Sequence, residues 1–429
     1  MRVVHGSSRW TVTEIPPAGV TIGRTTERRN ADLVLDDRRM SRRHIRIEAG
    51  MLAWELVDTE SKNGGFIDGR PFAPGERLKL LDGALIRLGD SLLVFRASAS
   101  MADAVAGDDA MFPGDSPHAA GVRRQLRRLG AASGHVLIHG ETGTGKERAA
   151  QFLGKAGAAR PFVAQNCAEL THELARSELF GHVRGAFSGA HAVKVGLIDT
   201  AGPGVLFLDE IAELPHDVQG DLLRFLEDGT FRPMGSTELR RSPARVVAAT
   251  NVDLDEAVRT GRFRRDLLAR LRASNAPLEL PPLRERREDI LGWARRFAIE
   301  AEGSCPDALF TAGTAECLLL YPWLENLREL RGLVRSLMAD RLEGSISPGK
   351  LPERLLAHRR ALRGDGEEGG SPLREPTAGE IAAALEETCG KMRTAAQRLG
   401  VDRRKLYRLC ERMGIDPGSY RREGDKEDG

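Results

Sequence analysis

Residues Gly140 to Glu147 read GETGTGKE and follow the short apolar run HVLI at 135–138. The glycines let the backbone turn with its N–H groups pointing inward, and Lys146 adds a mobile positive charge. Between a strand and a helix, such a P-loop binds nucleotide phosphates, whereas a glycine-rich turn without a ligand is the alternative. The pattern predicts nucleotide-phosphate binding by Gly140, Glu141, Thr142, Gly143, Thr144, Gly145, Lys146 and Glu147.

Glu147 departs from the usual pattern, because most P-loops carry there the Ser or Thr that contacts magnesium. Metal binding must then depend on an acid elsewhere. The apolar run VLFL at 205–208 ends in Asp209 and Glu210, and a buried parallel strand brings its last residues to the nucleotide edge of a sheet. Asp209 is therefore predicted to hold Mg²⁺ and Glu210 to polarise the attacking water.

Two acids after an apolar run are alone a weak signal, since they often mark only a strand that meets solvent. Combined with the P-loop, they predict an α/β NTPase in which Lys146, Asp209 and Glu210 are catalytic.

Composition sets broad limits on the chain. Its 429 residues suggest two or three domains, and a net charge of +2 does not indicate a partner. The five cysteines show no CxxC spacing, which fits a reducing cytosol and no zinc site. No signal peptide or membrane-spanning run is visible, so we expect a cytoplasmic protein without a membrane partner.

Residues 1–97 consist of short alternating apolar runs separated by turns, which predicts an all-β module. Within it come Gly23-Arg24, then the run SRRH at 41–44, then the run SKNG at 61–64. In this order and at these gaps, they resemble the forkhead-associated (FHA) domain, a β-sandwich that binds phosphothreonine peptides. Arg forks and hydroxyl donors on preformed loops suit a dianionic phosphate.

The FHA resemblance implies that Arg24, Ser41 and Arg42 contact the phosphate. It also implies that Asn63 contacts the peptide backbone and that His44 braces the loops. Two positions depart from the family pattern: Gly65 replaces the usual Thr, and Asp68 replaces the usual Asn. An FHA fold that no longer binds phosphate is the alternative.

Residues 98–111 are small, polar and acidic, which predicts a linker. The ATPase domain is expected at 112–358 and begins with a basic helix around 122–129, which we interpret as a solvated face rather than a nucleic-acid surface.

Several motifs of this domain resemble the AAA+ domain of sigma-54-dependent transcriptional activators, the bacterial enhancer-binding proteins. They include SELFGH at 177–182, LPPLRERREDI at 280–290 and LENLREL at 324–330. The most diagnostic motif is GAFSGA, made of Gly185, Ala186, Phe187, Ser188, Gly189 and Ala190. In the family this loop contacts sigma-54, and here Ser188 replaces the usual Thr. A hairpin whose Phe folds back into the core is the alternative for this loop.

Further roles follow from the resemblance. Asn166 matches the switch asparagine that restrains the catalytic glutamate, and Asn251 matches the sensor that reads the γ-phosphate. Arg264 and Arg270 match arginine fingers that act in the neighbouring subunit, which implies a homo-oligomer that assembles from dimer to hexamer ring. Arg328 matches the second sensor in a helical lid, although Leu324-Glu325 replaces the usual Pro-Gly before Asn326 at the entry turn of the lid.

A second linker is predicted at 359–376, followed by three helices within 377–423 and a polar tail at 424–429. The expected helices are 381–387, 392–399 and one capped by Asp402 that ends near 413, with a turn at 400–401. This spacing resembles the Fis-type helix-turn-helix, although a solvated three-helix bundle would show it too. The resemblance implies DNA contacts from Arg403, Arg404, Lys405, Tyr407 and Arg408.

The sequence thus predicts a multidomain protein. It has an FHA β-sandwich, a central α/β P-loop AAA+ ATPase with a helical lid, and a C-terminal α-helical DNA-binding domain. The expected partners are the sigma-54 RNA polymerase holoenzyme, enhancer DNA and a phosphothreonine protein from a Ser/Thr kinase pathway. ATP and Mg²⁺ are the expected cofactors. A DNA-binding repressor with a vestigial ATPase, or an AAA+ remodeller of another target, remain as alternatives.

Overall fold

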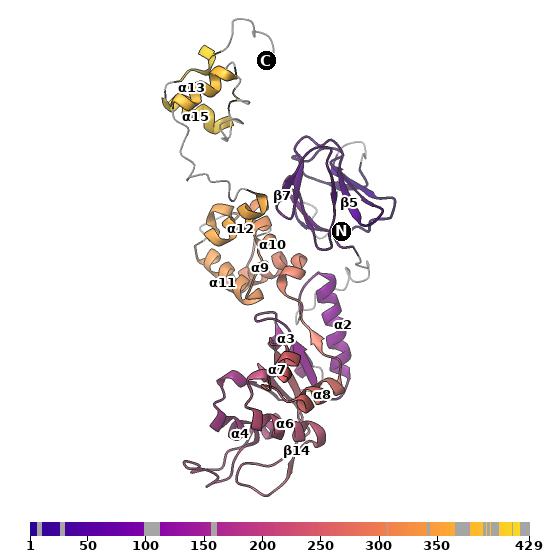
Figure 1. The fold of residues 1–429 in the computed structure, drawn as a ribbon, viewed down its shortest axis with the longest axis vertical. Helices are drawn as coiled ribbons and strands as arrows, with labels where there is room; N and C mark the ends of the chain where they lie inside the picture. Colours follow the sequence, from indigo (N-terminus) through magenta and orange to yellow (C-terminus); the bar gives the residue numbers. More distant parts are fainter. Residues whose placement is uncertain are drawn as a thin grey trace. The chain divides into compact units, whose positions relative to one another are not determined.

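The computed structural model describes residues 1–6, 11–25, 31–97, 112–155, 161–306, 308–340, 344–364, 378–388, 392, 395, 403–413 and 415–420. It divides into two compact units, Met1–Gly366 and Glu367–Gly429 (Figure 1). Within the described ranges, no helix is both long enough and apolar enough to span a membrane.

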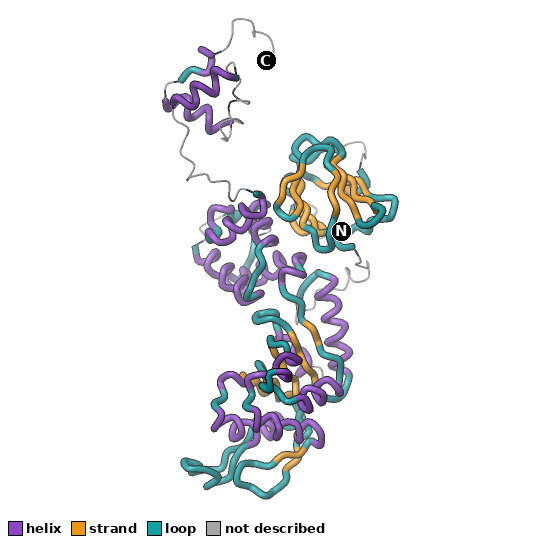
Figure 2. Tube along the Cα trace, in the orientation of Figure 1, coloured by secondary structure: helices purple, strands orange, loops and turns teal. Residues whose placement is uncertain are grey.

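The N-terminal module is a sandwich of two five-stranded sheets (Figure 2). One sheet has the order β1 (Arg2–His5), β10 (Ser91–Val94), β9 (Leu85–Leu88), β6 (Gly65–Ile67) and β7 (Arg70–Phe72). The other has the order β3 (Leu33–Leu35), β2 (Val20–Arg24), β4 (Ile45–Ala49), β5 (Trp54–Asp58) and β8 (Arg77–Lys79). Inward-facing residues such as Ile22, Ile47 and Leu88 are fully buried between the sheets. The predicted all-β module is confirmed.

The ATPase domain is built on a parallel sheet of order β12 (Phe162–Asn166), β13 (Val205–Asp209), β16 (Arg245–Thr250), β11 (Val136–His139) and β17 (Leu278–Glu279). Side chains alternate between two cores, because Phe207 packs with α2 and α3 while Leu206 and Leu208 pack with α4 to α8. Burial on both faces explains why β13 reads as a continuous apolar run. Parallel pairing brings the ends of β12 and β13 to one edge of the sheet.

The helices around this sheet are α2 (Pro117–Ala131), α3 (Lys146–Lys155), α4 (His172–Phe180), α5 (Leu197–Ala201), α6 (His216–Asp228), α7 (Leu254–Arg259) and α8 (Arg265–Ser274). Short 3₁₀ helices are η1 (Cys167–Glu169), η2 (Ile211–Glu213) and η3 (Leu283–Glu285), and β14 (Thr230–Phe231) pairs with β15 (Arg240–Arg241).

The basic helix α2 has the solvated face that was expected, with one exception. Its Arg123 is buried and donates hydrogen bonds from Nη1 to the carbonyl oxygens of Phe112 and Gly114 at 3.2 and 2.6 Å. Arg124, Arg127 and Arg128 are exposed.

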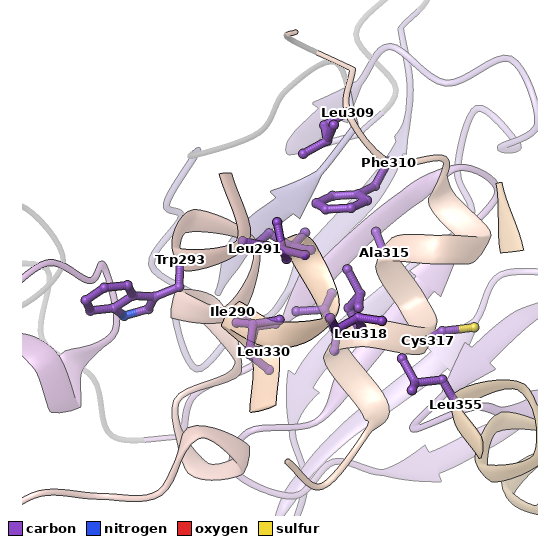
Figure 3. Close-up of a cluster of buried hydrophobic side chains, with 14 of the residues drawn as sticks. Ile290, Leu291, Trp293, Leu309, Phe310, Ala315, Cys317, Leu318, Leu330 and Leu355 are labelled. Atoms are coloured by element: carbon purple, nitrogen blue, oxygen red, sulfur yellow. The ribbon is translucent and has the colours of Figure 1, made fainter. Parts of the chain in front are cut away.

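A helical lid follows, made of α9 (Arg287–Glu302), α10 (Ala312–Leu320), α11 (Asn326–Ala339), η4 (Pro348–Lys350) and α12 (Glu353–Arg363). Its core includes Leu318, Leu330 and Leu355 (Figure 3), and the buried indole of Trp323 donates to the Leu318 carbonyl at 2.8 Å. Helix α12 continues to Arg363, so the predicted start of the second linker at residue 359 was wrong.

The C-terminal unit contains α13 (Ala378–Glu387), α15 (Arg403–Met413) and η5 (Pro417–Tyr420). Ile381, Leu385, Leu406 and Leu409 are buried in one small core. These helices lie where the first and third helices were predicted. Of the predicted second helix at 392–399, only Met392 and Ala395 are described, and the predicted turn at 400–401 and the Asp402 cap lie outside the described residues.

Candidate functional site

The P-loop turns as its glycines predict. Gly143 and Gly145 have φ of 76° and 109°, a region that side chains other than glycine rarely occupy. At Gly143 the space is also closed, because an added Cβ would lie 2.1 Å from the Glu325 carbonyl oxygen. The backbone of the lid therefore contacts the phosphate loop at Gly143, and a residue with a Cβ would clash there.

Lys146 begins α3 and points back over the loop. Its Nζ donates to the carbonyl oxygens of Gly140 and Glu141 at 3.0 and 3.4 Å, and it lies 3.9 Å from Oε1 of Glu210. Burial lowers the pKa of the ammonium group, while the carboxylates of Glu210 and Asp209 oppose this shift. The lysine is thus held among weak carbonyl partners that a phosphate could replace.

The acidic pair ends β13 beside the P-loop. Asp209 lies opposite Asn166 of β12, and its Oδ1 accepts a hydrogen bond from the Glu210 amide at 3.0 Å. Glu210 has left-handed backbone angles, φ 49° and ψ 50°, a conformation that costs about 1 to 3 kcal/mol for a residue other than glycine. The two carboxylates supply the oxygen ligands that Mg²⁺ prefers, so the residues fit this metal.

A cavity of about 530 Å³ opens between the P-loop and the lid. Of the predicted set, Thr142, Gly143, Gly145, Lys146, Glu147, Asp209, Glu210 and Arg328 line it, together with lid residues. Glu147 is exposed and accepts a hydrogen bond from Gln151 at 3.2 Å, and the chain therefore places a carboxylate where a hydroxyl is usual. A second cavity of about 650 Å³ lies beside α2 and η3 and does not include the Lys146, Asp209 and Glu210 set.

Two asparagine side chains donate hydrogen bonds to residues of the P-loop. Asn251 follows β16 and donates to Thr142 Oγ1 at 3.0 Å, next to the phosphate loop as predicted. Asn326 was missed by the sequence reasoning. It is buried, its Oδ1 accepts from the Leu283 amide at 2.7 Å, and its Nδ2 donates to Glu141 Oε2 and the Thr142 carbonyl at 3.1 and 3.0 Å.

Asn326 also forms the entry turn of the lid, where Leu324-Glu325 replaces Pro-Gly. Trp323 and Asn326 take left-handed φ values of 49° and 52°, and the Leu327 amide donates to the Gly143 carbonyl at 3.0 Å. The turn therefore forms without the usual residues.

Trp293 and Phe297 of α9 were also missed, because apolar residues in an amphipathic helix read as core. Both line the nucleotide cavity, with ring centroids 5.4 Å apart. The Arg148 guanidinium of α3 lies 5.1 Å from the Trp293 ring centroid. Trp293 Nε1 is buried and has no hydrogen-bond partner within the described part of the chain.

Several predicted residues do not line this cavity: Gly140, Glu141, Thr144, Asn251, Asn166, Arg264 and Arg270. The last three make other contacts. Arg264 pairs with Asp266 at 2.7 Å, and Arg270 donates from Nη2 to the Leu226 carbonyl at 2.8 Å. Asn166 accepts from the Ala168 amide at 3.0 Å, and a bond from its side chain to Glu210 is not among the hydrogen bonds of the described residues.

The GAFSGA segment forms a closed hairpin, in which the Gly185 amide donates to the Ala190 carbonyl at 2.8 Å. Phe187 is 39% exposed and meets the His182 ring edge-on at a centroid distance of 5.0 Å. A second loop, between β14 and β15, packs beside it, and the Val183 amide donates to the Met234 carbonyl at 3.1 Å. The sequence reasoning missed this second loop.

The predicted phosphopeptide residues gather at one end of the FHA sandwich. The Arg24 amide donates to the Ser41 carbonyl at 3.0 Å, and Ser41 Oγ accepts from the Lys62 amide at 3.1 Å. His44 is fully buried and bonds through its ring nitrogens to the Ser41 amide and the Gly64 carbonyl, at 3.0 and 2.9 Å.

Arg42 and Asn63 of this set are exposed to solvent. Asn63 Nδ2 also donates to the Arg39 carbonyl at 3.1 Å, which holds its loop in place. Arg24 Nε is buried without a hydrogen-bond partner in the described ranges. An unpaired buried guanidinium nitrogen is costly unless an anion completes it.

Of the predicted DNA contacts, Arg403, Arg404, Lys405 and Arg408 lie on α15, but their side chains are outside the described residues. Tyr407 on the same helix is 44% exposed.

Comparison with known proteins assigns the first unit. Residues 112–276 match the model of the sigma-54 interaction domain, residues 20–89 the FHA domain, and residues 284–366 the AAA+ ATPase lid domain.

The relatives are bacterial regulators. The transcriptional regulatory protein ZraR of Klebsiella oxytoca is 38% identical over 303 residues, which cover 70% of this chain and 68% of ZraR. The DNA-binding transcriptional regulator NtrC of Salmonella typhimurium is 37% identical over 332 residues, covering 71% and 70%. AlgB of Pseudomonas aeruginosa is 44% identical, over 51% of this chain and 49% of its own length.

A solved structure is also similar to this chain. NtrX of Brucella abortus in complex with ATP aligns with a TM-score of 0.50 at 29% identity, covering 70% of this chain and 69% of NtrX. These matches and the P-loop geometry together show that the chain belongs to the family of transcriptional regulators that carry a sigma-54 interaction domain with an AAA+ ATPase fold.

Proposed function

We propose that the chain is an ATP-dependent activator that remodels the closed promoter complex of sigma-54 RNA polymerase. The observation that carries this proposal is the convergence of Lys146, Asp209 and Glu210 on one cavity between P-loop and lid. ATP would bind there, with Asp209 holding Mg²⁺ and Glu210 polarising the attacking water. Bound magnesium would offset the charge of the phosphates.

Hydrolysis would require a ring. Arg264 and Arg270 do not line the nucleotide cavity of their own chain, and their guanidinium groups have local partners in Asp266 and the Leu226 carbonyl. After a change of partner they would act on the nucleotide of a neighbouring subunit. A closed ring supplies every site with such an arginine, and the hexamer is the ring that the family resemblance implies.

The hairpin Gly185–Ala190 would contact sigma-54, with half-exposed Phe187 as its apolar contact. At the other end of the chain, α15 would read enhancer DNA. The FHA loops would bind a phosphothreonine protein produced by a Ser/Thr kinase pathway, and the unpaired Arg24 Nε supports an anionic ligand there.

Open-complex formation on a supercoiled sigma-54 promoter tests this function, with purified protein, ATP and a Glu210→Gln variant as the control. We expect promoter melting by the wild type and none by the variant. ATP hydrolysis without melting, even with phosphopeptide present, would show that the ATPase acts on another target. Ser188 in place of the family's Thr makes that outcome the main competitor.

A further inference from the structure

The FHA domain and the lid share one hydrophobic core. Val4, Leu85, Leu92 and Val94 of the FHA sandwich are at most 2% exposed and belong to the same buried cluster as Leu318 and the other lid residues of Figure 3. Gly69, in the turn between β6 and β7, approaches α12 so closely that an added Cβ would lie 3.1 Å from Leu362. The predicted linker at 98–111 therefore does not separate two independent bodies.

A buried carboxylate ties the same surfaces together. Glu316 of α10 is 1% exposed, and its Oε2 accepts from Arg87 of β9 at 2.7 Å and from Arg363 of α12 at 2.9 Å. Arg359 of α12 lies 3.5 Å from the same oxygen. A second pair joins Arg96 to Glu288 of α9 through two bonds of 2.7 Å. Charge-assisted bonds of this kind need a fixed mutual geometry.

The predicted phosphopeptide loop at 61–64 leads into β6, which lies at the contact between the FHA domain and the lid. Asn63 is followed by Gly64 and then by β6, whose Phe66 ring carries the Arg363 guanidinium at 4.4 Å from its centroid. Asp68, just after β6, pairs with Arg287 at the start of α9. Asp68 replaces the Asn usual in FHA domains, and its contact with the lid gives that replacement a physical reason.

Helix α9 continues the connection to the nucleotide. Arg287 opens this helix, and Trp293, about 9 Å further along at 1.5 Å per residue, lines the nucleotide cavity against Arg148 of α3. Figure 3 shows the Trp293 indole pointing away from the rest of the lid cluster. One helix thus contacts the FHA domain at its first turn and the nucleotide cavity one and a half turns later.

We propose that phosphothreonine-peptide binding and nucleotide binding within one chain are energetically coupled through β6 and the lid. The FHA domain packs against the lid as part of the same core. When a bound peptide orders the Asn63 loop, the contacts of Phe66 with α12 and of Asp68 with α9 change. This inference rests on the proposed phosphothreonine sensing. Coupling between two sites is reciprocal, so each ligand changes the affinity of the other by one common factor.

The test measures ADP affinity of the full chain by calorimetry, with and without a saturating pool of phosphothreonine peptides of randomised flanks. The same pool without phosphate is the ligand control. We expect the peptides to change the ADP dissociation constant by about 5-fold or more, in line with typical coupling energies. ADP must change the peptide dissociation constant, followed by fluorescence anisotropy, by the same factor.

Paired variants locate the route. Arg287→Met combined with Arg363→Met removes the contacts of Asp68 and Phe66 with the lid. This double variant should retain both ligands while the coupling falls below 2-fold. Arg354→Met is the matched control, because this α12 arginine pairs with Glu329 of the lid at 3.4 Å and is 54% exposed. If the double variant fails to bind ADP, the single Arg363→Met variant replaces it, and a smaller coupling in that variant than in the wild type supports the route. Unequal coupling factors in the two wild-type titrations would contradict it.

The outcomes separate the two proposals. If no phosphorylated peptide binds, phosphothreonine sensing fails and this inference fails with it. If peptides bind but leave the ADP affinity unchanged, or if the double variant keeps the full coupling, only the inference is overturned.

Discussion

Replacing Glu316 by Gln should destabilise the junction of the FHA domain and lid by about 3 kcal/mol. The substitution preserves the size of the side chain but removes the negative charge that the three arginines share in this buried cluster. Breaking a buried ion pair typically costs about 3–5 kcal/mol, because the remaining charge stays desolvated. We take the lower figure since Arg87, Arg359 and Arg363 keep 17%, 18% and 22% of their side chains exposed.

Calorimetric unfolding of the full chain at neutral pH measures this effect. A loss of this size lowers the midpoint by about 6–12 °C for a cooperative unit of 150 to 250 residues. Glu329→Gln is the control in the neighbouring helix, because its partner Arg354, at 3.4 Å, is 54% exposed, and an ion pair with one solvated partner should be worth about 1 kcal/mol or less. Equal shifts in the two variants would refute the reasoning, since they would mean that the cluster is solvated in solution.

Three further predictions concern the ATPase domain. Arg270→Ala and Glu210→Gln proteins should each be inactive, yet a mixture should hydrolyse ATP, because one subunit supplies the arginine and the other the glutamate; a phosphate-release assay that finds no recovery would exclude action between subunits. Trp293→Phe should abolish most of the change in intrinsic fluorescence on ADP binding, whereas Trp54→Phe in the FHA sheet should retain it; a full signal in the first variant would show that the indole does not meet the nucleotide. Burial lowers the pKa of His135 from 6.5 to about 4. Between these pH values the unfolded chain binds a proton on this histidine and the folded chain does not. The free energy of unfolding should therefore fall by up to about 3 kcal/mol as the pH drops from 6.5 to about 4. Thermal unfolding across this range checks the last point, and a His135→Gln variant with the same slope would contradict it.

Local patterns predicted the catalytic edge of the sheet. The apolar runs at 135–138 and 205–208 became β11 and β13, since a strand buried on both faces has to be apolar throughout. Parallel pairing then carried Asp209 to the P-loop without any further signal being needed. Asn251 could be placed for the same reason, because it follows the next strand of that sheet.

Contacts between residues far apart in the sequence could not be predicted from local patterns. Glu316, Arg359 and Arg363 read as the polar face of solvated helices, and only the three-dimensional arrangement shows that they meet Arg87 from a domain more than two hundred residues earlier. Asn326 was hidden for a different reason. Its role depends on a left-handed backbone at the lid entry, which the absence of glycine there argued against.

The shared core also bears on how such regulators exchange their input domains. A module that is joined only by a tether can be replaced by cutting and rejoining the tether. Here a cut at residues 98–111 would leave Leu92 and Val94 on one fragment and Leu318 on the other facing water, at about 1.5 to 3 kcal/mol for each large side chain. Grafting a different sensor onto this ATPase, in evolution or in the laboratory, therefore requires compensating changes in α9, α10 and α12 as well as a new N-terminus.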